Sequence, residues 1–147
     1  MYQRILVPSD GSDTAALGLR EAIKLARNQG GRIRIVHVIN DLPLIAPEVA
    51  GATLEHVLAR LRTDGAVIVK DAEKAVRDAG LEVDSKMLEA IGGPAGEHIV
   101  QEARAWPADV IVCGTHGRRG IRRIVMGSDA EYILRHTPVP VLLVRSG

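Results

Sequence analysis

Short apolar runs alternate with helix-like stretches along the whole chain, and this alternation is the strongest constraint on its fold. The runs at residues 5–8, 33–39 and 110–113 are almost continuously apolar. Strands of that kind are typical of a parallel sheet that is covered on both faces. We therefore predict an α/β fold with a single doubly wound parallel sheet. Its five expected strands are residues 5–8, 33–39, 81–88, 110–113 and 139–144.

The first two helices are predicted from apolar stripes. In the first, Ser12 or Asp13 provides the N-cap and Gly30-Gly31 ends the helix. Its stripe is Ala15, Leu19, Ala22 and Ala26, with Ile23 beside it. The second helix has a longer stripe of Leu54, Leu58, Leu61, Gly65, Ile68, Ala72, Ala75 and Ala79. Gly65 either costs this helix about 1 kcal/mol relative to alanine or marks a break at residues 63–65.

Two shorter helices are expected in the second half. One follows Gly92-Gly93-Pro94 and ends at Trp106-Pro107, and the other spans about 128–135. Residues 40–52 are interpreted as a long loop, either a lid over a ligand or a plain packed loop. No linker or repeat interrupts the chain, so one domain, residues 1–147, is expected.

The most distinctive local feature is the glycine stretch that follows residues 110–113. Two residues separate Gly114 from Gly117, and nine more precede the pair Gly127-Ser128. Glycine lets a backbone approach a ligand closely, and a helix beginning at Gly127-Ser128 offers free N–H groups to an anion. In doubly wound sheets ligands bind at the carboxyl ends of the strands, where this stretch would meet the turn Ser9-Asp10-Gly11. We interpret the stretch as a phosphate site.

Composition excludes several other classes of function. The formal net charge is +1 and aromatic residues make up 2%, which argues against a nucleic-acid partner. No apolar stretch reaches the roughly 20 residues of a membrane helix, and the first strand begins too early for a signal peptide. The single cysteine, Cys113, is read as an inert core thiol rather than a reactive one. A cytoplasmic protein is expected.

Familiar catalytic motifs are absent. None of the four lysines, Lys24, Lys70, Lys74 and Lys86, follows a glycine, so there is no P-loop. The chain has no Gly-x-Gly-x-x-Gly after the first strand and no Gly-x-Ser-x-Gly elbow. The five histidines are too scattered to form a helical metal pair.

The remaining pattern, Gly-x2-Gly-x9-Gly-Ser, resembles that of the universal stress protein family, in its ATP-binding branch. Ile-Leu-Val-Pro-Ser-Asp-Gly-Ser at the start, His37-Val38, and Pro-Val-Pro-Val-Leu-Leu-Val at the end also look like that family. The resemblance implies a Rossmann-like sheet of the adenine-nucleotide alpha-hydrolase type in strand order 3-2-1-4-5. It also implies a homodimer that pairs the last strands, which begin at Val139 and end at Val144.

The same resemblance implies a set of residues that bind ATP, with Mg²⁺ as its counter-ion. Asp10 is the one side chain that would approach the metal, through the Mg-nucleotide. Ala130 departs from the family pattern, because a threonine or serine often stands there and alanine removes a hydroxyl contact. The implied nucleotide-binding residues are Pro8, Ser9, Asp10, Val38, Cys113, Gly114, Gly117, Gly127, Ser128, Asp129 and Ala130.

Simpler structural roles compete with the functional ones. Ser128 and Glu131 fit a capping box, and Asp10 fits a helix-starting turn. Gly114 and Gly117 fit ordinary turns, Gly120 is read as loop, and His37 and His116 are read as structural histidines. Four arginines in the glycine stretch either neutralise a triphosphate or form a solvated or dimer-facing charge run: Arg118, Arg119, Arg122 and Arg123.

Three hypotheses of function follow. The leading one is a homodimeric universal stress protein that binds ATP as a regulator of the stress response. The second is a dimeric interaction module that binds no nucleotide. The third is an enzyme, disfavoured because no general base or nucleophile stands ready for fast phosphoryl transfer, so that any ATP hydrolysis would be slow.

Overall fold

The five strands form one parallel sheet, as the alternating pattern predicts. The computed structural model describes residues 2–40, 52–90, 93–115 and 127–145. Its strand order is β3-β2-β1-β4-β5, which confirms the predicted topology. The strands are β1 (Arg4–Pro8), β2 (Arg32–Asn40), β3 (Val83–Ala90), β4 (Val110–Gly114) and β5 (Val141–Val144).

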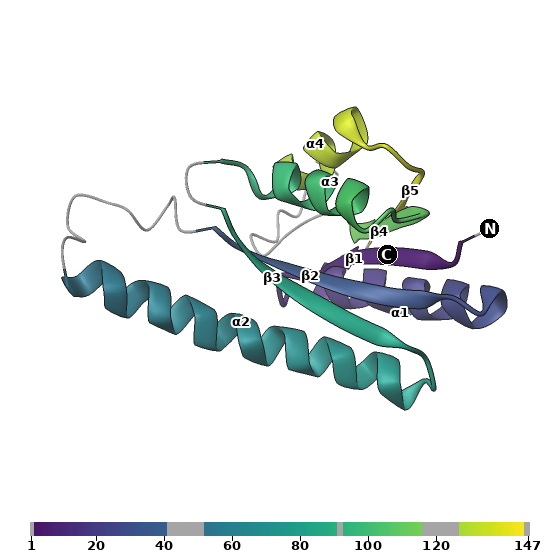
Figure 1. Ribbon diagram of the computed structural model, residues 1–147, viewed down its shortest axis with the longest axis horizontal. Coiled ribbons are helices and arrows are strands. Elements are labelled where there is room, and N and C mark those ends of the chain that lie inside the picture. The colour runs from purple at the N-terminus through teal and green to yellow at the C-terminus, as the bar shows by residue number, and fades with distance from the viewer. Residues whose placement is uncertain (1, 41–51, 91–92, 116–126, 146–147) are drawn as a thin grey trace.

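Helices cover both faces of this sheet. In Figure 1, α1 (Asp13–Gln29) and α2 (Ala52–Asp78) lie on one side, and α3 (Ala95–Ala105) and α4 (Ser128–His136) lie on the other. Successive strand residues point to opposite faces, so the central strands supply two cores at once. Ile5 and Val7 pack toward α1 and α2, whereas Leu6 packs toward α3 and α4.

The predicted ends of α1 are confirmed. The Ser12 side chain accepts a hydrogen bond from the N–H of Ala15, which places Ser12 at the N-cap. Gly30 ends the helix in the left-handed region with φ of 66°, where glycine carries no Cβ penalty. The expected stripe of Ala15, Leu19, Ala22 and Ala26 is buried.

The α2 helix decides between the two interpretations of Gly65 and corrects the expected buried stripe. It continues through Gly65 without a break, and a Cβ at Gly65 would lie 2.7 Å from Cδ2 of His37. Glycine is therefore present for close packing against β2, not to interrupt the helix. The buried stripe also differs, since Val69 and Val76 are buried while the predicted Ala75 is exposed. The predicted stripe alternates steps of four and three, which is an average of 3.5 residues per turn. A straight helix has 3.6 residues per turn, so the face that contacts the sheet shifts gradually around the helix axis.

The last strand is shorter than expected. It spans Val141–Val144, so Val139 and Pro140 lie outside it. The N–H of Val139 donates to the Thr137 hydroxyl at 3.1 Å and is thereby used in a local turn. Pro140 has no N–H, although its carbonyl accepts from the N–H of Ile111 at 3.0 Å. β5 therefore begins at Val141, the first residue after these two whose backbone N–H can take part in pairing between strands.

A partly buried ion cluster interrupts the apolar pattern of β2. Arg34 donates to Glu102 of α3 at 2.8 Å and to Asp84 of β3 at 2.7 Å, and it lies 4.6 Å from the Trp106 ring. Glu102 is only 5% exposed and receives a second cation, Lys86, at 3.4 Å. Two cations and the surrounding hydrogen bonds offset the cost of burying this carboxylate. The cluster joins β2, β3 and α3.

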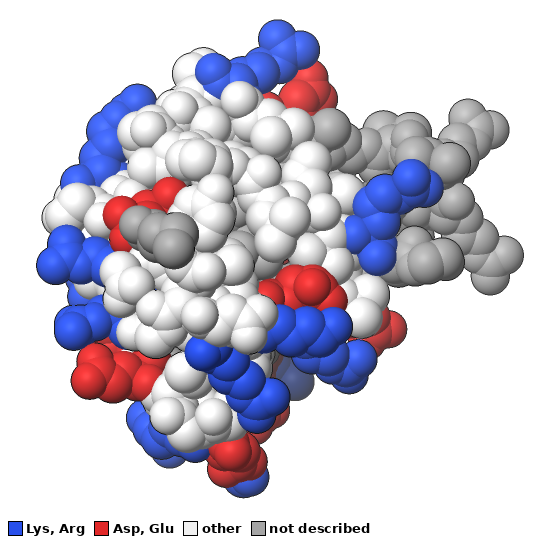
Figure 2. Space-filling view, turned by 90° about the vertical axis from the view of Figure 1, so that its right-hand side faces the viewer, with Lys and Arg blue, Asp and Glu red and all other residues white. Residues whose placement is uncertain are grey.

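Charged side chains of both signs are mixed over the surface at the end where the strands begin. Figure 2 views the molecule from that end and shows blue and red groups interspersed around an uncharged area. This distribution agrees with the formal net charge of +1.

The Arg34–Asp84 pair predicts a specific dependence of stability on pH. The Arg34 hydrogen bond lowers the pKa of the Asp84 carboxyl in the folded protein. A lowered folded pKa contributes stability above the pKa of the unfolded chain, and that contribution is lost as pH falls through the folded pKa. We expect Asp84→Asn to lose stability at pH 7 and to narrow the difference between pH 7 and pH 3, measured by urea unfolding.

The magnitude should be modest, because the Asp84 side chain is 55% exposed and solvent screens the pair. Asp71→Asn, at an exposed position of α2, is the matched control and should keep the wild-type pH dependence. If Asp84→Asn lost as much stability between pH 7 and pH 3 as the wild-type protein does, the stabilising role of the Arg34–Asp84 pair would be contradicted.

Candidate functional site

The carboxyl ends of β1 and β4 lie side by side, as the sequence predicts. The two strands pair in parallel, with Ile5 opposite Val110 and Leu6 opposite Ile111. The start of α1 packs directly against the end of β4: a Cβ at Gly114 would lie 2.6 Å from Cγ2 of Thr14 and 2.9 Å from its carbonyl oxygen. Gly114 therefore has a packing role that is independent of any ligand.

The two ends of the glycine stretch are joined by a hydrogen bond. The N–H of Gly127 donates to the Thr115 carbonyl at 2.6 Å, which fixes the start of α4 beside the end of β4. Gly127 is the N-cap, and the N–H of Glu131 donates to its carbonyl at 3.0 Å. Ser128 is thus the first residue of the helix and not its cap. The capping box was wrong, and among the described residues no side-chain hydrogen bond caps α4.

The start of α4 has the geometry of an anion site. Ser128, Asp129 and Ala130 occupy its first three positions, where helix geometry leaves N–H groups without partners inside the helix. The Asp129 carboxylate is turned to α3, where it accepts from the N–H of Gly96 at 3.1 Å. Ala130 is buried and offers only its backbone. The partial positive charge of the helix end favours an anion there.

The turn after β1 is held by short-range hydrogen bonds. The N–H of Ser9 donates to the Val36 carbonyl at 2.9 Å, and Oδ1 of Asp10 accepts from the N–H of Ser12 at 2.9 Å. Asp10 therefore has the helix-starting role that the sequence offered as its simpler interpretation. Pro8, Ser9 and Asp10 are half-buried at the same edge of the sheet as Gly114.

His37 and Val38 lie near the end of β2. His37 is 7% exposed, and its Nδ1 lies 2.8 Å from the Ser9 carbonyl, which agrees with a structural histidine. Val38 is half-buried and pairs with Leu88 of β3. The structure thus brings Val38 to the same edge of the sheet as the turn after β1.

Cys113 is buried, and burial raises the pKa of its thiol to about 11. A thiol with this pKa stays protonated near neutral pH, and the thiolate is the reactive form. The prediction that Cys113 lies in the core is confirmed, and its raised pKa agrees with an inert thiol.

Several predicted residues lie outside the described ranges. They are Gly117, His116, Gly120, Arg118, Arg119, Arg122, Arg123 and residues 41–51 of the long loop. Within the described ranges, no cluster of three or more His, Cys, Asp or Glu side chains is placed to hold a metal ion. No helix in that part of the chain is long and apolar enough to cross a membrane.

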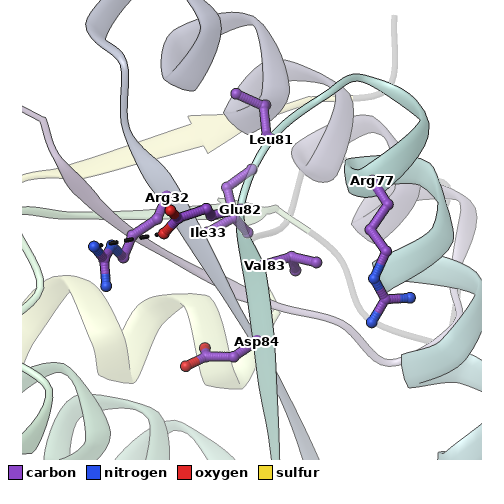
Figure 3. A pocket seen from close by; sticks show the side chains of 7 residues that line it. All are labelled: Arg32, Ile33, Arg77, Leu81, Glu82, Val83 and Asp84. Carbon is purple, nitrogen blue, oxygen red and sulfur yellow. Dashed lines mark ion pairs between the residues drawn. The ribbon is translucent and has the colours of Figure 1, made fainter.

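A shallow hollow lies at the other end of the strands, where β2 and β3 begin. It is formed by Arg32, Ile33, Arg77, Leu81, Glu82, Val83 and Asp84. Figure 3 shows Arg32 and Glu82 as an ion pair, whose charged atoms are 3.5 Å apart, while Arg77 comes from the end of α2. The hollow lies where strands begin, whereas the glycine stretch follows the end of β4. The charged side chains of the hollow are all paired: Arg32 with Glu82, Arg77 with Glu73 and Asp84 with Arg34.

Sequence reasoning missed the contacts that hold the site in place. The hydrogen bond from Gly96 to Asp129 links residues 33 positions apart, and the one between His37 and Ser9 links residues 28 apart. Neither follows from local spacing. Gly65 stood out in the sequence as a glycine inside a helical pattern, but the pattern did not reveal that this glycine packs against His37.

The chain as a whole matches a known family. The model of the universal stress protein family matches residues 1–145. The chain belongs to the universal stress protein family.

Similar proteins extend over nearly the full length of the chain. Universal stress protein MJ0531 of Methanocaldococcus jannaschii is 32% identical over 99% of this chain and 83% of its own length. The solved structure of MJ0577, from the same organism, is 25% identical with a TM-score of 0.88, covering 100% of this chain and 98% of the other. A universal stress protein of Archaeoglobus fulgidus, solved in complex with dAMP, is 25% identical with a TM-score of 0.70, covering 97% and 98%.

The packing of Gly114 gives a stability test. We expect Gly114→Ala to lose about 1–3 kcal/mol in the free energy of unfolding, because the new methyl group meets the Thr14 backbone and strains α1 against β4. Gly93→Ala is the control, since among the described residues a Cβ there meets only the flexible end of Glu97, at 3.5 Å. Urea denaturation measures both, and equal stability of the two variants would contradict this packing role.

Proposed function

We propose that this universal stress protein binds an adenine nucleotide, ATP with Mg²⁺, as a homodimeric regulator of the stress response. The observation that carries the proposal is the start of α4, which the bond from Gly127 to Thr115 fixes to the end of β4. Within the described ranges no side chain caps this helix start. Helix starts of this kind bind phosphate groups through their N–H groups.

In this proposal the phosphates lie at the start of α4. The N–H groups of Ser128, Asp129 and Ala130 would bind them, and the Ser128 hydroxyl would add a contact. Because the Asp129 carboxylate is bonded to Gly96, its negative charge is directed to α3 and does not cap the helix. Gly127 has no side chain, so none of its own atoms would stand between the helix start and a phosphate. Gly117 would complete the cradle together with Gly114.

The adenosine would lie between the ends of β1 and β2. Pro8, Ser9 and Asp10 would flank the ribose. Oδ2 of Asp10 would accept from a hydroxyl or approach the Mg²⁺ of the nucleotide. The Val38 backbone would face the adenine. Cys113 would line the site through its backbone, since its thiol is buried. The dAMP complex of the Archaeoglobus fulgidus relative supports an adenine nucleotide as the ligand class.

The same geometry disfavours rapid catalysis. Oδ1 of Asp10 is bonded to the N–H of Ser12, and the buried Cys113 thiol is protonated at neutral pH. Slow hydrolysis, well below about one turnover per second, fits these residues better than ordinary enzyme rates.

We place the protein in the cytoplasm, where the Cys113 thiol would be kept reduced.

ATP binding is tested by releasing and then restoring the ligand. Denatured, freshly purified protein should release adenine nucleotide detectable by mass spectrometry, and ATP should raise the melting temperature of the apo protein. Gly127→Leu should abolish that thermal shift, because a bulky side chain would fill the start of α4. At ATP concentrations of 100 Kd, binding is worth about 2.7 kcal/mol, which is readily measured.

Gly93→Leu is the matched control, because Gly93 stands two residues before α3 as Gly127 stands just before α4. It should keep the ATP shift. If wild-type protein neither carries nucleotide nor responds to millimolar ATP, the ATP proposal fails and the dimeric interaction module becomes the better explanation.

The proposed homodimer pairs β5 with its copy. β5 is an edge strand, and its Leu142 is 42% exposed. An exposed apolar edge strand tends to pair with another strand. We expect wild-type protein to be a dimer by light scattering and Leu142→Arg to be monomeric, since symmetric pairing would bring two arginines together.

Val67→Arg is the control, because Val67 is 55% exposed on α2, away from β5. It should remain dimeric. A dimer that survives Leu142→Arg would place the interface elsewhere, without affecting the nucleotide proposal.

A further inference from the structure

His37 is a buried polar residue to which the proposed nucleotide contacts give no role. It lies near the carboxyl end of β2 and is 7% exposed. Its Nδ1 is 2.8 Å from the Ser9 carbonyl oxygen. A carbonyl oxygen only accepts hydrogen bonds, so Nδ1 carries the hydrogen and donates it.

This bond completes the attachment of Ser9 to β2. The N–H of Ser9 donates to the Val36 carbonyl at 2.9 Å, and its carbonyl accepts from the next residue along β2, His37. Both polar groups of the Ser9 backbone are therefore held by the same strand. The position of the peptide that leads into Asp10 depends on the orientation of the His37 ring.

The ring is in turn held by α2. A Cβ at Gly65 would lie 2.7 Å from Cδ2 and 2.9 Å from Nε2 of His37, so the helix backbone rests on the ring. The same hypothetical Cβ would lie 2.9 Å from the Met87 methyl group. With so little space on this side, the ring cannot turn away from Ser9 without displacing α2.

A second contact joins α2 to the same turn. One turn of helix after Gly65, the Ile68 side chain approaches Gly11, where a Cβ would lie 3.0 Å from its Cδ1. Gly11 has φ of 84°, a conformation that other residues rarely adopt. Residues three apart share one face of a helix, so a single face of α2 contacts both the His37 ring and the turn after β1.

We propose that His37 is a positioning residue for the nucleotide site, and that it couples nucleotide affinity to the packing of α2. It acts through the Ser9 carbonyl, which sets the turn that flanks the ribose. Gly65 keeps the ring in place. This inference rests on the proposed nucleotide binding and adds to it a route by which a change at α2 alters affinity. A histidine that only fills the core would affect stability and leave affinity unchanged.

The first test compares two substitutions of His37. In His37→Asn the amide nitrogen takes the place of Nδ1, whereas His37→Leu removes the donor. ATP dissociation constants are measured by calorimetry on the full-length protein, at a temperature where every variant is folded. We expect His37→Leu to weaken ATP binding about tenfold, as for a lost hydrogen bond, and His37→Asn to stay within about threefold of wild type.

The second test acts from α2. Gly65→Ala places a methyl group against the ring and should weaken ATP binding severalfold, although Gly65 itself would not touch the nucleotide. Gly80→Ala is the matched control: Gly80 follows α2 with φ of 78°, and nothing lies within 4 Å of a Cβ there. It should lower the melting temperature while leaving the ATP dissociation constant unchanged.

The outcomes separate this inference from the proposed function. Wild-type protein that does not bind ATP overturns both. Wild-type binding with unchanged affinity in His37→Leu and Gly65→Ala overturns the positioning role alone. If His37→Leu does not fold, the ATP dissociation constants of Gly65→Ala and His37→Asn decide the result, and an unchanged value in Gly65→Ala overturns the positioning role. Long-range ¹⁵N spectra of the imidazole supply an independent readout, and hydrogen found on Nε2 alone would overturn the bond to Ser9.

Discussion

The parallel sheet, buried on both faces, is the constraint on which the rest of this structure depends. Each central strand must supply apolar side chains to two cores, as Ile5 and Val7 do on one face and Leu6 does on the other. Parallel strands also bring all their carboxyl ends to one edge. The polar turns and glycines therefore collect at that edge, which is where the proposed nucleotide site lies.

Glycine serves this architecture by permitting close contact between backbones. Gly114 lets the end of β4 meet α1, Gly65 lets α2 meet the His37 ring, and Gly96 lets α3 meet α4, where a Cβ would lie 2.9 Å from Cβ of Tyr132. These contacts hold the surroundings of the proposed site in a fixed geometry. A preorganised backbone loses little conformational freedom on binding, and this favours the retention of a ligand.

Charge is distributed differently in the body of the fold and at the site. The Glu102 carboxylate is buried but paired with Arg34 and Lys86, and it joins α3 to the sheet. At the start of α4 the acidic side chain in the first turn, Asp129, is bonded to Gly96 of α3. The first cluster stabilises the packing of layers, and the second contact joins the start of α4 to α3.

The sequence by itself determined the fold class and both caps of α1, because these depend on local patterns. It also placed Cys113 in the core, because that residue lies in a recognisable buried strand. The order of the strands came from the family resemblance. The sequence did not determine that β5 starts at Val141, that Val69 and Val76 replace Ala75 in the buried stripe, or that Ser128 lies inside α4. The contacts of Gly65 with His37, and of Asp129 with Gly96, were decided only by the tertiary structure. They join residues far apart in the chain, and only the packing of helices onto the sheet brings such residues together.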